Sequence, residues 1–167
     1  GKLHRAFSVL LFNTSGELLI QKRAKEKITF PSIWANSCCS HPLHIDSEIN
    51  GIKGAKNAAK RKLEQELGIN PNKINIDDLQ YVTKMRYKAR ADAKWIEYEI
   101  DYIFAIKCDV ETNPNKIEIE ETKYVDAEQL EAIFNDENAK IGPWFRLIKE
   151  NFLNDIWNSL DNLNLVE

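Results

Sequence analysis

A thiol and an imidazole stand close together in residues 36–42, which read Asn-Ser-Cys-Cys-Ser-His-Pro. Cys39 lies two residues before His41, and its neighbour Cys38 cannot easily form a disulfide with it, because adjacent cysteines rarely reach the required geometry. Cys39 is therefore a candidate nucleophile, proton carrier or metal ligand. The alternative is that both cysteines are buried and inert near the end of a strand, since free cysteine is among the most buried residue types.

Three carboxylates alternate along a second segment, at Glu97, Glu99 and Asp101. Side chains two apart in a strand project to the same face, so these acids line one side of a predicted strand while apolar and aromatic residues line the other. The acids form either the solvated face of an edge strand or, as the apolar run after Asp101 favours, a row inside the sheet. Carboxylates this close raise one another's pKa unless a cation holds them ionised.

His4 and His41 each lie beside a predicted strand and are the imidazoles available to such a cation. Together with Glu97 and Glu99 they form a candidate set of nitrogen and oxygen ligands, which suits Zn²⁺, Mn²⁺ or Mg²⁺ without deciding among them. Taken singly, each histidine is more typical of a structural residue, and we assign His44, in the following loop, to that class.

Basic residues from several segments form a second candidate cluster. They are Arg23 and Lys27 ahead of a Phe-Pro pair, Lys62 on a predicted helix, and Arg86 and Lys88 on either side of a tyrosine. Guanidinium and ammonium groups that converge from separate elements suit a diphosphate. The segment around Lys27 is equally typical of an ordinary solvated turn.

The helix predicted at residues 55–67 carries two acids that could join this cluster. Its small and apolar residues recur at helical spacing, and Gly68 stands where a helix commonly ends. Glu64 and Glu66 are candidate ligands of a Mg²⁺ ion that bridges phosphate oxygens. The alternative is that both are surface acids that form salt links along the helix.

The remaining segments predict a mixed α/β protein with one domain. Apolar runs predict strands at residues 4–12, 17–23, 33–40, 79–88, 95–107 and 124–125. Gly51 and Gly54 indicate a loop before the first helix. Asp126 is a predicted helix N-cap, and Pro143 is the predicted first residue of an amphipathic helix that continues to Leu160.

Composition restricts the function classes. The 167 residues suffice for one buried core, with 43% hydrophobic and 29% charged residues. A net charge of −3 gives no reason to expect nucleic acid or an anionic membrane as partner, and no apolar run approaches the roughly 20 residues of a membrane span. Three cysteines without a framework spacing indicate an intracellular, soluble protein, cytoplasmic or in an organelle. We expect a monomer, and an upstream segment removed before Gly1.

Residues 61–69, Arg-Lys-Leu-Glu-Gln-Glu-Leu-Gly-Ile, resemble the second half of a Nudix box, whose pattern ends in Arg-Glu-U-x-Glu-Glu-x-Gly-U with U aliphatic. The resemblance is degenerate, because Lys62 and Gln65 replace two acids, and Ser47 and Lys53 stand at the positions of the first Gly and Glu. In Nudix hydrolases those acids hold the metals that cleave a diphosphate, so their loss argues against hydrolysis.

The degenerate box and five further motifs together resemble the type I isopentenyl-diphosphate isomerase family, in its eukaryotic branch. The motifs are His-Arg-Ala-Phe-Ser at 4–8, the Cys-Cys segment at 36–42, Arg-Tyr-Lys-Ala at 86–89, Glu-Tyr-Glu-Ile-Asp-Tyr at 97–102 and Pro-Trp-Phe at 143–145. The resemblance implies one Nudix-type domain over residues 1–167, with a mixed sheet between helices. It also implies a small prenyl diphosphate as substrate.

The resemblance assigns roles by position. It implies Cys39 and Glu99 as the catalytic pair, with Tyr87 beside Glu99 and Trp144 over the substrate. The implied ligands of a second divalent metal are His4, His41, Glu97 and Glu99. Glu66 would carry the Mg²⁺ of the diphosphate, which Arg23, Lys27 and Lys62 would bind. The family has one more ligand histidine upstream of the His4 position, which this sequence does not contain.

The implied reaction moves a double bond from isopentenyl to dimethylallyl diphosphate. It needs an acid and a base on opposite faces of an alkene, in a pocket that excludes water. Glu99 is our choice for the proton donor and Cys39, as thiolate, for the base, and the opposite assignment stays open because the reaction is reversible. The alternatives are a Nudix hydrolase of a diphosphate substrate and an inactive Nudix-fold module that binds a metal or ligand.

Overall fold

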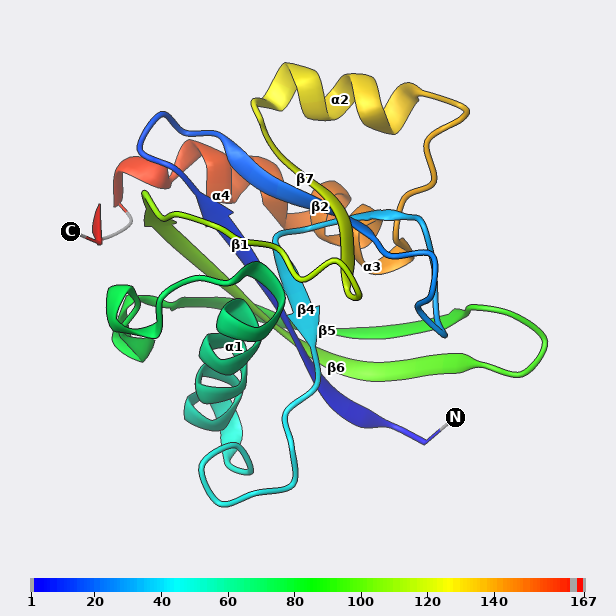
Figure 1. Ribbon diagram of the computed structural model, residues 1–167, viewed down its shortest axis with the longest axis horizontal. Coiled ribbons are helices and arrows are strands. Elements are labelled where there is room, and N and C mark those ends of the chain that lie inside the picture. Colours follow the sequence, from blue (N-terminus) through cyan, green and yellow to red (C-terminus); the bar gives the residue numbers. More distant parts are fainter. Residues whose placement is uncertain (1, 163–164, 167) are drawn as a thin grey trace.

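The computed structural model describes residues 2–162 and the backbone of residues 165–166, which form one mixed sheet with helices on both faces (Figure 1). The strands are β1 (His4–Phe12), β2 (Leu18–Arg23), β3 (Trp34–Ala35), β4 (Cys38–Ser40), β5 (Gln80–Arg90), β6 (Ile96–Cys108), β7 (Ile119–Val125) and β8 (Leu165–Val166). The helices are α1 (Gly51–Leu67), α2 (Ala127–Asn135), α3 (Pro143–Ile148) and α4 (Asn154–Asn158). Short 3₁₀ turns lie at Pro71–Lys73, Ile76–Asp78 and Leu160–Asn162, and a π-helical turn at Lys149–Leu153 joins α3 to α4.

The sheet is built around the parallel pair β1 and β6. Its strand order is β3-β2-β1-β6-β5, while β4, β7 and β8 pair with β1, β2 and β6. The register of β1 and β6 sets His4 opposite Glu99 and Phe12 opposite Lys107. From Ala6 onward every residue of β1 is buried, as expected for a strand covered on both faces. The predicted mixed α/β architecture is confirmed.

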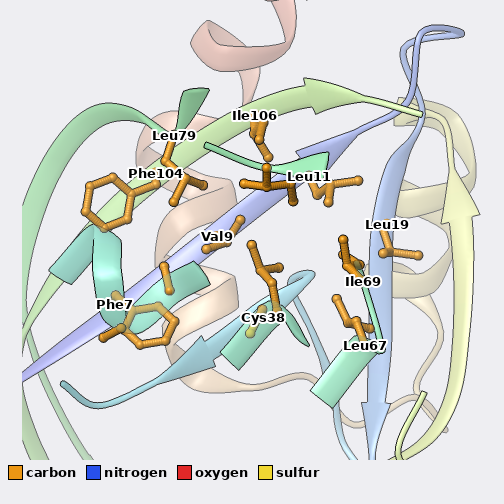
Figure 2. Close-up of a cluster of buried hydrophobic side chains, with 14 of the residues drawn as sticks. Phe7, Val9, Leu11, Leu19, Cys38, Leu67, Ile69, Leu79, Phe104 and Ile106 are labelled. Carbon is orange, nitrogen blue, oxygen red and sulfur yellow. The ribbon is translucent and has the colours of Figure 1, made fainter. Parts of the chain in front are cut away.

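Two apolar cores lie on the two faces of β1. Figure 2 shows the first, in which Phe7, Val9 and Leu11 pack with residues of α1 and β6. Leu10 and Phe12 point to the other face and pack with the segment from α3 to α4. Alternate residues of one strand therefore hold both helical layers to the sheet, at about 1.5–3 kcal/mol for each fully buried large side chain.

Helix α1 begins earlier than the sequence predicts. We expected Gly51 and Gly54 in a loop, but the helix begins at Gly51, so that expectation is wrong. Gly54 is a glycine because of close packing and not because it lies in a loop: a Cβ at this position would lie 2.5 Å from the carbonyl oxygen of Glu48. The glycine is inside the helix because nothing larger fits there. The predicted end is confirmed, since Gly68 adopts a left-handed conformation (φ 63°) and donates its N–H to the Glu64 carbonyl.

The predicted strand at 33–40 is two short strands, β3 and β4, separated by Asn36 and Ser37. Both side chains replace ladder hydrogen bonds of the sheet. The Asn36 amide donates to the Val9 carbonyl at 3.0 Å, and the Ser37 hydroxyl donates to the Leu19 carbonyl at 2.6 Å while accepting from the Leu11 amide at 2.8 Å. Both polar side chains are buried and hydrogen-bonded, and the hydrophobic periodicity of the sequence does not reveal these contacts.

The C-terminal helix is also interrupted. The sequence predicts one amphipathic helix from Pro143 to Leu160, but a π-helical turn divides it into α3 and α4.

Asp126 is confirmed as the N-cap of α2, where it forms a capping box with Gln129. In the part of the chain that the structure describes, no helix is long and apolar enough to cross a bilayer.

The loop at residues 42–50, which leads from His41 to α1, is held by buried polar contacts. The Glu48 carboxylate accepts from the Leu43 amide and from two nitrogens of Arg61, at 2.8–2.9 Å. The Arg5 guanidinium donates to the carbonyls of Glu48, Ile49 and Gly51. Glu48 is 3% exposed, so its charge depends on these partners.

We predict that Glu48→Gln lowers the free energy of unfolding by about 1–2 kcal/mol at pH 7, because the buried pair with Arg61 loses its charge. The hydrogen bonds from Arg61 lower the pKa of Glu48, although burial opposes them. A lowered folded-state pKa gives stability that is present above the unfolded value of about 4.3 and is lost as pH falls through the folded value. In urea denaturation, the free energies of unfolding of wild type and Glu48→Gln should therefore converge as the pH falls from 7.

Glu64→Gln, on the exposed side of α1, is the control and should change the free energy of unfolding little. Equal stability of Glu48→Gln and wild type at pH 7 would contradict the prediction.

Candidate active site

A cavity of about 410 Å³ opens over the ends of the central strands. Most of the residues that the sequence singled out line it. They are Arg23, Lys27, Cys39, His41, Glu66, Glu97, Glu99 and Trp144. The walls come from β1, β2, β4, β6, α1 and α3 and from the loops after β2 and before β7. Residues more than 100 positions apart thus share one site.

Two imidazoles and one carboxylate form the candidate metal group. Glu99 Oε1 lies 3.2 Å from Nε2 of His4 and 2.5 Å from Nε2 of His41, and the ring centroids of the histidines are 4.8 Å apart. These ligand atoms lie within 4.8 Å of one another. A divalent ion about 2.0–2.2 Å from each ligand would hold them roughly 3–3.5 Å apart, so the group fits a metal after a small separation of His41 and Glu99.

Glu97, the fourth expected ligand, lines the cavity but is not part of this group of close ligand atoms. Burial and the charge of Glu99 raise the pKa of its carboxyl, while Thr29 and Arg23 act in the opposite direction. The same acid row affects His41, whose pKa burial would lower but which the hydrogen bond to Glu99 and the surrounding carboxylates raise. The site therefore concentrates negative charge beside its two imidazoles.

The two cysteines face different surroundings. Cys39 lies opposite Ser8 in the pairing of β4 with β1 and lines the cavity. Burial raises the pKa of its thiol strongly, and the nearby positive charge of Arg23 only partly offsets this. Cys38 points the other way, into the core shown in Figure 2, where its Sγ donates to Glu66 Oε2 at 3.2 Å.

Two aromatic side chains, Tyr87 and Trp144, pack against each other at the site, and Trp144 is the one of the two that lines the cavity. Tyr87 lies opposite Glu99 in the pairing of β5 with β6 and is 1% exposed. Its ring meets Trp144 edge to face at 6.2 Å, and its hydroxyl has no hydrogen-bond partner among the described residues. Burial, reinforced by Glu97 and Glu99, raises the pKa of Tyr87, so it is a neutral phenol. The Trp144 indole N–H donates to Asn36 Oδ1 at 3.0 Å, which fixes the ring against the cavity.

Basic groups belong to the same site, and Arg23 and Lys27 line the cavity. The Arg23 guanidinium lies 5.6 Å from the Trp144 ring and donates to the carbonyls of Thr29 and Phe30. Lys62 lies 3.6 Å from Glu66 on the next turn of α1. Arg86 and Lys88, which we had grouped with these bases, are exposed on the opposite face of the β5–β6 hairpin and each lie 5.3 Å from the Tyr98 ring, so that grouping is wrong.

Asp101 also lines the cavity, although we did not predict it as a site residue from the sequence. It is 2% exposed, accepts a hydrogen bond from the Ser8 hydroxyl at 2.8 Å, and has a second oxygen without a partner among the described residues. Burial raises its pKa to about 7, against the hydrogen bond from Ser8. The alternation of acids at 97, 99 and 101 was the available signal. Asn36 carried no comparable signal, because its role depends on Trp144, 108 residues away.

The chain is similar to known proteins over nearly its whole length. The model of the NUDIX domain family matches residues 2–145. The chain is 49% identical over 167 residues to the isopentenyl-diphosphate delta-isomerase of Gibberella zeae, covering 97% of this chain and 66% of that protein. It is also 49% identical over 177 residues to the isopentenyl-diphosphate delta-isomerase of Dictyostelium discoideum, covering 100% of this chain and 74% of that protein.

The chain belongs to the Nudix family, among the isopentenyl-diphosphate isomerases. It spans 66% and 74% of the length of these two relatives. A solved NUDIX hydrolase from Alicyclobacillus acidocaldarius shares the fold with a TM-score of 0.69 at 8% identity, over 89% of this chain and 90% of that one. The predicted Nudix-type fold is confirmed.

The Nudix box of this chain is altered where a hydrolase needs acids. In α1, Lys62 contacts Glu66, and Gln65 is exposed and accepts from Arg61 at 3.2 Å. Glu64 is exposed as well, so Glu66 is the one acid of the box in the lining of the cavity. A single acid with a lysine beside it leaves little capacity for several metal ions.

We predict that His41→Gln weakens binding of a divalent metal at the group with His4 and Glu99 by at least about 10-fold, because one of three close ligands is lost. Competition of Zn²⁺ or Mn²⁺ against a chromophoric chelator measures the affinity. His44→Gln is the matched control, since His44 is exposed three residues further on and outside the group, and it should leave the affinity unchanged. Equal losses in both variants, or none in His41→Gln, would contradict this metal site.

Proposed function

We propose that this protein is an isomerase that converts isopentenyl diphosphate to dimethylallyl diphosphate in isoprenoid biosynthesis. The observation that carries the proposal is that a half-buried thiol, a carboxylate and basic side chains line one cavity. Cys39 and Glu99 can transfer protons at a carbon atom. Arg23 and Lys27, which line the cavity, suit a diphosphate, and so does Lys62, which contacts the lining residue Glu66 without lining the cavity itself. The relatives named as isomerases support the same reaction.

The proposed substrate lies along the cavity, with its diphosphate at the basic end and its alkene between Cys39 and Glu99. Trp144 forms the wall between the two ends, because it contacts Arg23 on one side and Tyr87 on the other. This order places the carbon chain against aromatic surface, where water is excluded. An aromatic face can also stabilise the positive charge that develops at the tertiary carbon.

In the proposed reaction, a proton is added to C4 of the C3=C4 double bond, and the resulting tertiary cation loses a proton from C2 to give the C2=C3 double bond. In the forward direction we assign Cys39, which is held as a thiol, as the donor, and Glu99, whose Oε1 lies beside two imidazoles, as the acceptor. This reverses our first choice from the sequence, where both assignments stayed open. Each group must take both roles, because the reaction is reversible.

The metals of the proposed site have separate ligands. His4, His41 and Glu99 would hold one divalent ion, with Glu97 close by, and Glu66 would carry the Mg²⁺ of the diphosphate. Bound cations would compensate the acid row and the phosphate charge. The chain's own residues orient these groups: Cys38 donates to Glu66, and Lys62 holds its other oxygen.

Two other functions are less well supported. A hydrolase needs the acids that Lys62 and Gln65 replace in the altered box. An inactive binding module would not need Cys39 and Glu99 in the same cavity as the bases, but it is consistent with the metal group alone.

The reaction class is tested by proton and phosphorus NMR of the protein with isopentenyl diphosphate and Mg²⁺ in D₂O. We expect dimethylallyl diphosphate to form, deuterium to enter at C2 and C4, and both phosphates to stay intact. Release of free phosphate without isomerisation would identify a hydrolase, and binding without either reaction would identify an inactive module. A prenyl monophosphate serves as the control for recognition of the second phosphate.

We also predict that Cys39→Ala and Glu99→Gln each reduce turnover by at least about 10³-fold, because each removes a group that transfers a proton to or from carbon. Circular dichroism and thermal melting should show that the variants remain folded. Cys108→Ala is the control for loss of a buried thiol, because Cys108 lies at the far end of β6 and outside the cavity lining. Turnover within tenfold of wild type would remove the substituted residue from the catalytic pair.

A further inference from the structure

An ion pair inside the cavity occupies one of the bases that the proposed diphosphate needs. Lys27 Nζ lies 2.5 Å from Glu118 Oε2, and both side chains line the cavity. The two side chains are 26% and 27% exposed, so solvent screens the pair only in part. No local pattern predicts this contact, because the two residues are 91 positions apart.

Sheet pairing fixes the position of Glu118. The residue immediately precedes β7, which pairs with β2 so that Arg23 lies opposite Ile119. The Ala24 amide donates to the Glu118 carbonyl at 3.0 Å, and the Lys27 amide contacts the Ala24 carbonyl at 3.3 Å. The backbone therefore brings the carboxylate of Glu118 and the ammonium of Lys27 within reach of each other.

The charges around the pair are nearly balanced before any ligand binds. Three bases, Arg23, Lys27 and Lys62, lie near three acids, Glu26, Glu66 and Glu118, so these charges balance. Burial acts to raise the pKa of Glu118, but the hydrogen bond and charge of Lys27, with Lys62 and Arg23 behind it, lower it. Glu118 is therefore a carboxylate at neutral pH.

We propose that Glu118 is an internal competitor for the diphosphate: it holds Lys27 in the free protein and yields the ammonium when a diphosphate enters. This inference rests on the proposed function, in which Lys27 binds the substrate's phosphates. A diphosphate must displace the carboxylate and approach its negative charge, so Glu118 limits how tightly substrate and product bind. The same carboxylate takes back the ammonium as product leaves, which favours release.

Two other roles for Glu118 make different predictions. If the pair only clamps the two loops, neutralising Glu118 lowers stability and leaves diphosphate binding unchanged or weaker. If Glu118 is a ligand of the diphosphate's Mg²⁺ ion, neutralising it weakens binding in the presence of Mg²⁺. Competition alone predicts tighter binding, and only when Lys27 is present.

Isothermal titration of the protein with inorganic pyrophosphate and Mg²⁺ tests the inference without requiring turnover. The variants are Glu118→Gln, Lys27→Met and the double substitution. Glu120→Gln is the matched control, because Glu120 is an exposed acid two residues along, outside the cavity lining. We expect Glu118→Gln to bind about tenfold more tightly than wild type, Glu120→Gln to bind like wild type, and the gain to fall below about threefold in the Lys27→Met background.

Pyrophosphate binding by wild type with no gain in Glu118→Gln would overturn the competitor role and leave the proposed function standing. An equal gain with and without Lys27 would also overturn it, because the effect would then be general repulsion. No pyrophosphate binding by wild type or by Glu118→Gln would overturn both the inference and the diphosphate site on which it rests. Raising the salt concentration should reduce the gain, since the pair is partly exposed.

Discussion

The parallel pairing of β1 with β6 is the constraint on which the rest of the site depends. It sets His4 opposite Glu99 and brings Ser8 within a hydrogen bond of Asp101. Because side chains alternate along a strand, a slip of one residue would turn the acid row of β6 away from the cavity and into the core beneath α1. The apolar residues of β1, which pack on both faces, prevent such a slip. The two cores therefore fix the chemistry as well as the fold.

Several ionisable groups are buried in and around the cavity, where burial disfavours their charged forms. The hydrogen bonds that compensate for this desolvation differ from one group to the next. Glu48, outside the cavity, has a full set of partners, and its pKa is lowered. Asp101 has a partner for one oxygen only, and its pKa is raised to about 7. The contrast is physical: complete hydrogen bonding favours the carboxylate, while burial without it favours the neutral acid. Incomplete compensation of buried acids is typical of sites that bind cations or move protons.

The same fold supports hydrolases, and the side chains of α1 account for the difference. A hydrolase presents several acids of its Nudix box to metal ions. Here one of those positions is Lys62, which contacts Glu66, and another is the exposed Gln65. The proposed catalytic residues lie on the sheet and not on the helix: Cys39 is on β4 and Glu99 is on β6, and both strands pair with β1. The fold alone thus says little about the reaction, and the residues at the ends of its strands say more.

The sequence by itself determined the strands with strong apolar patterns, the end of α1 at Gly68 and the residue types of the candidate site. It did so because alternation, helical spacing and glycine punctuation are local properties of the chain. It failed at Gly54, where the carbonyl of Glu48 leaves no room for a side chain, and at Asn36, whose partner Trp144 is 108 residues away. It also failed at the π-helical turn.

Only the tertiary structure decided which of the candidate residues meet. The bases of β5 had the right chemistry for a diphosphate but lie on the wrong face, because strand parity sends Arg86 and Tyr87 in opposite directions. Conversely, Glu118 and Asn36 had no distinguishing pattern and lie at the cavity or against its wall. Local sequence specifies which groups a strand offers; the pairing of strands far apart in the chain specifies what those groups can reach.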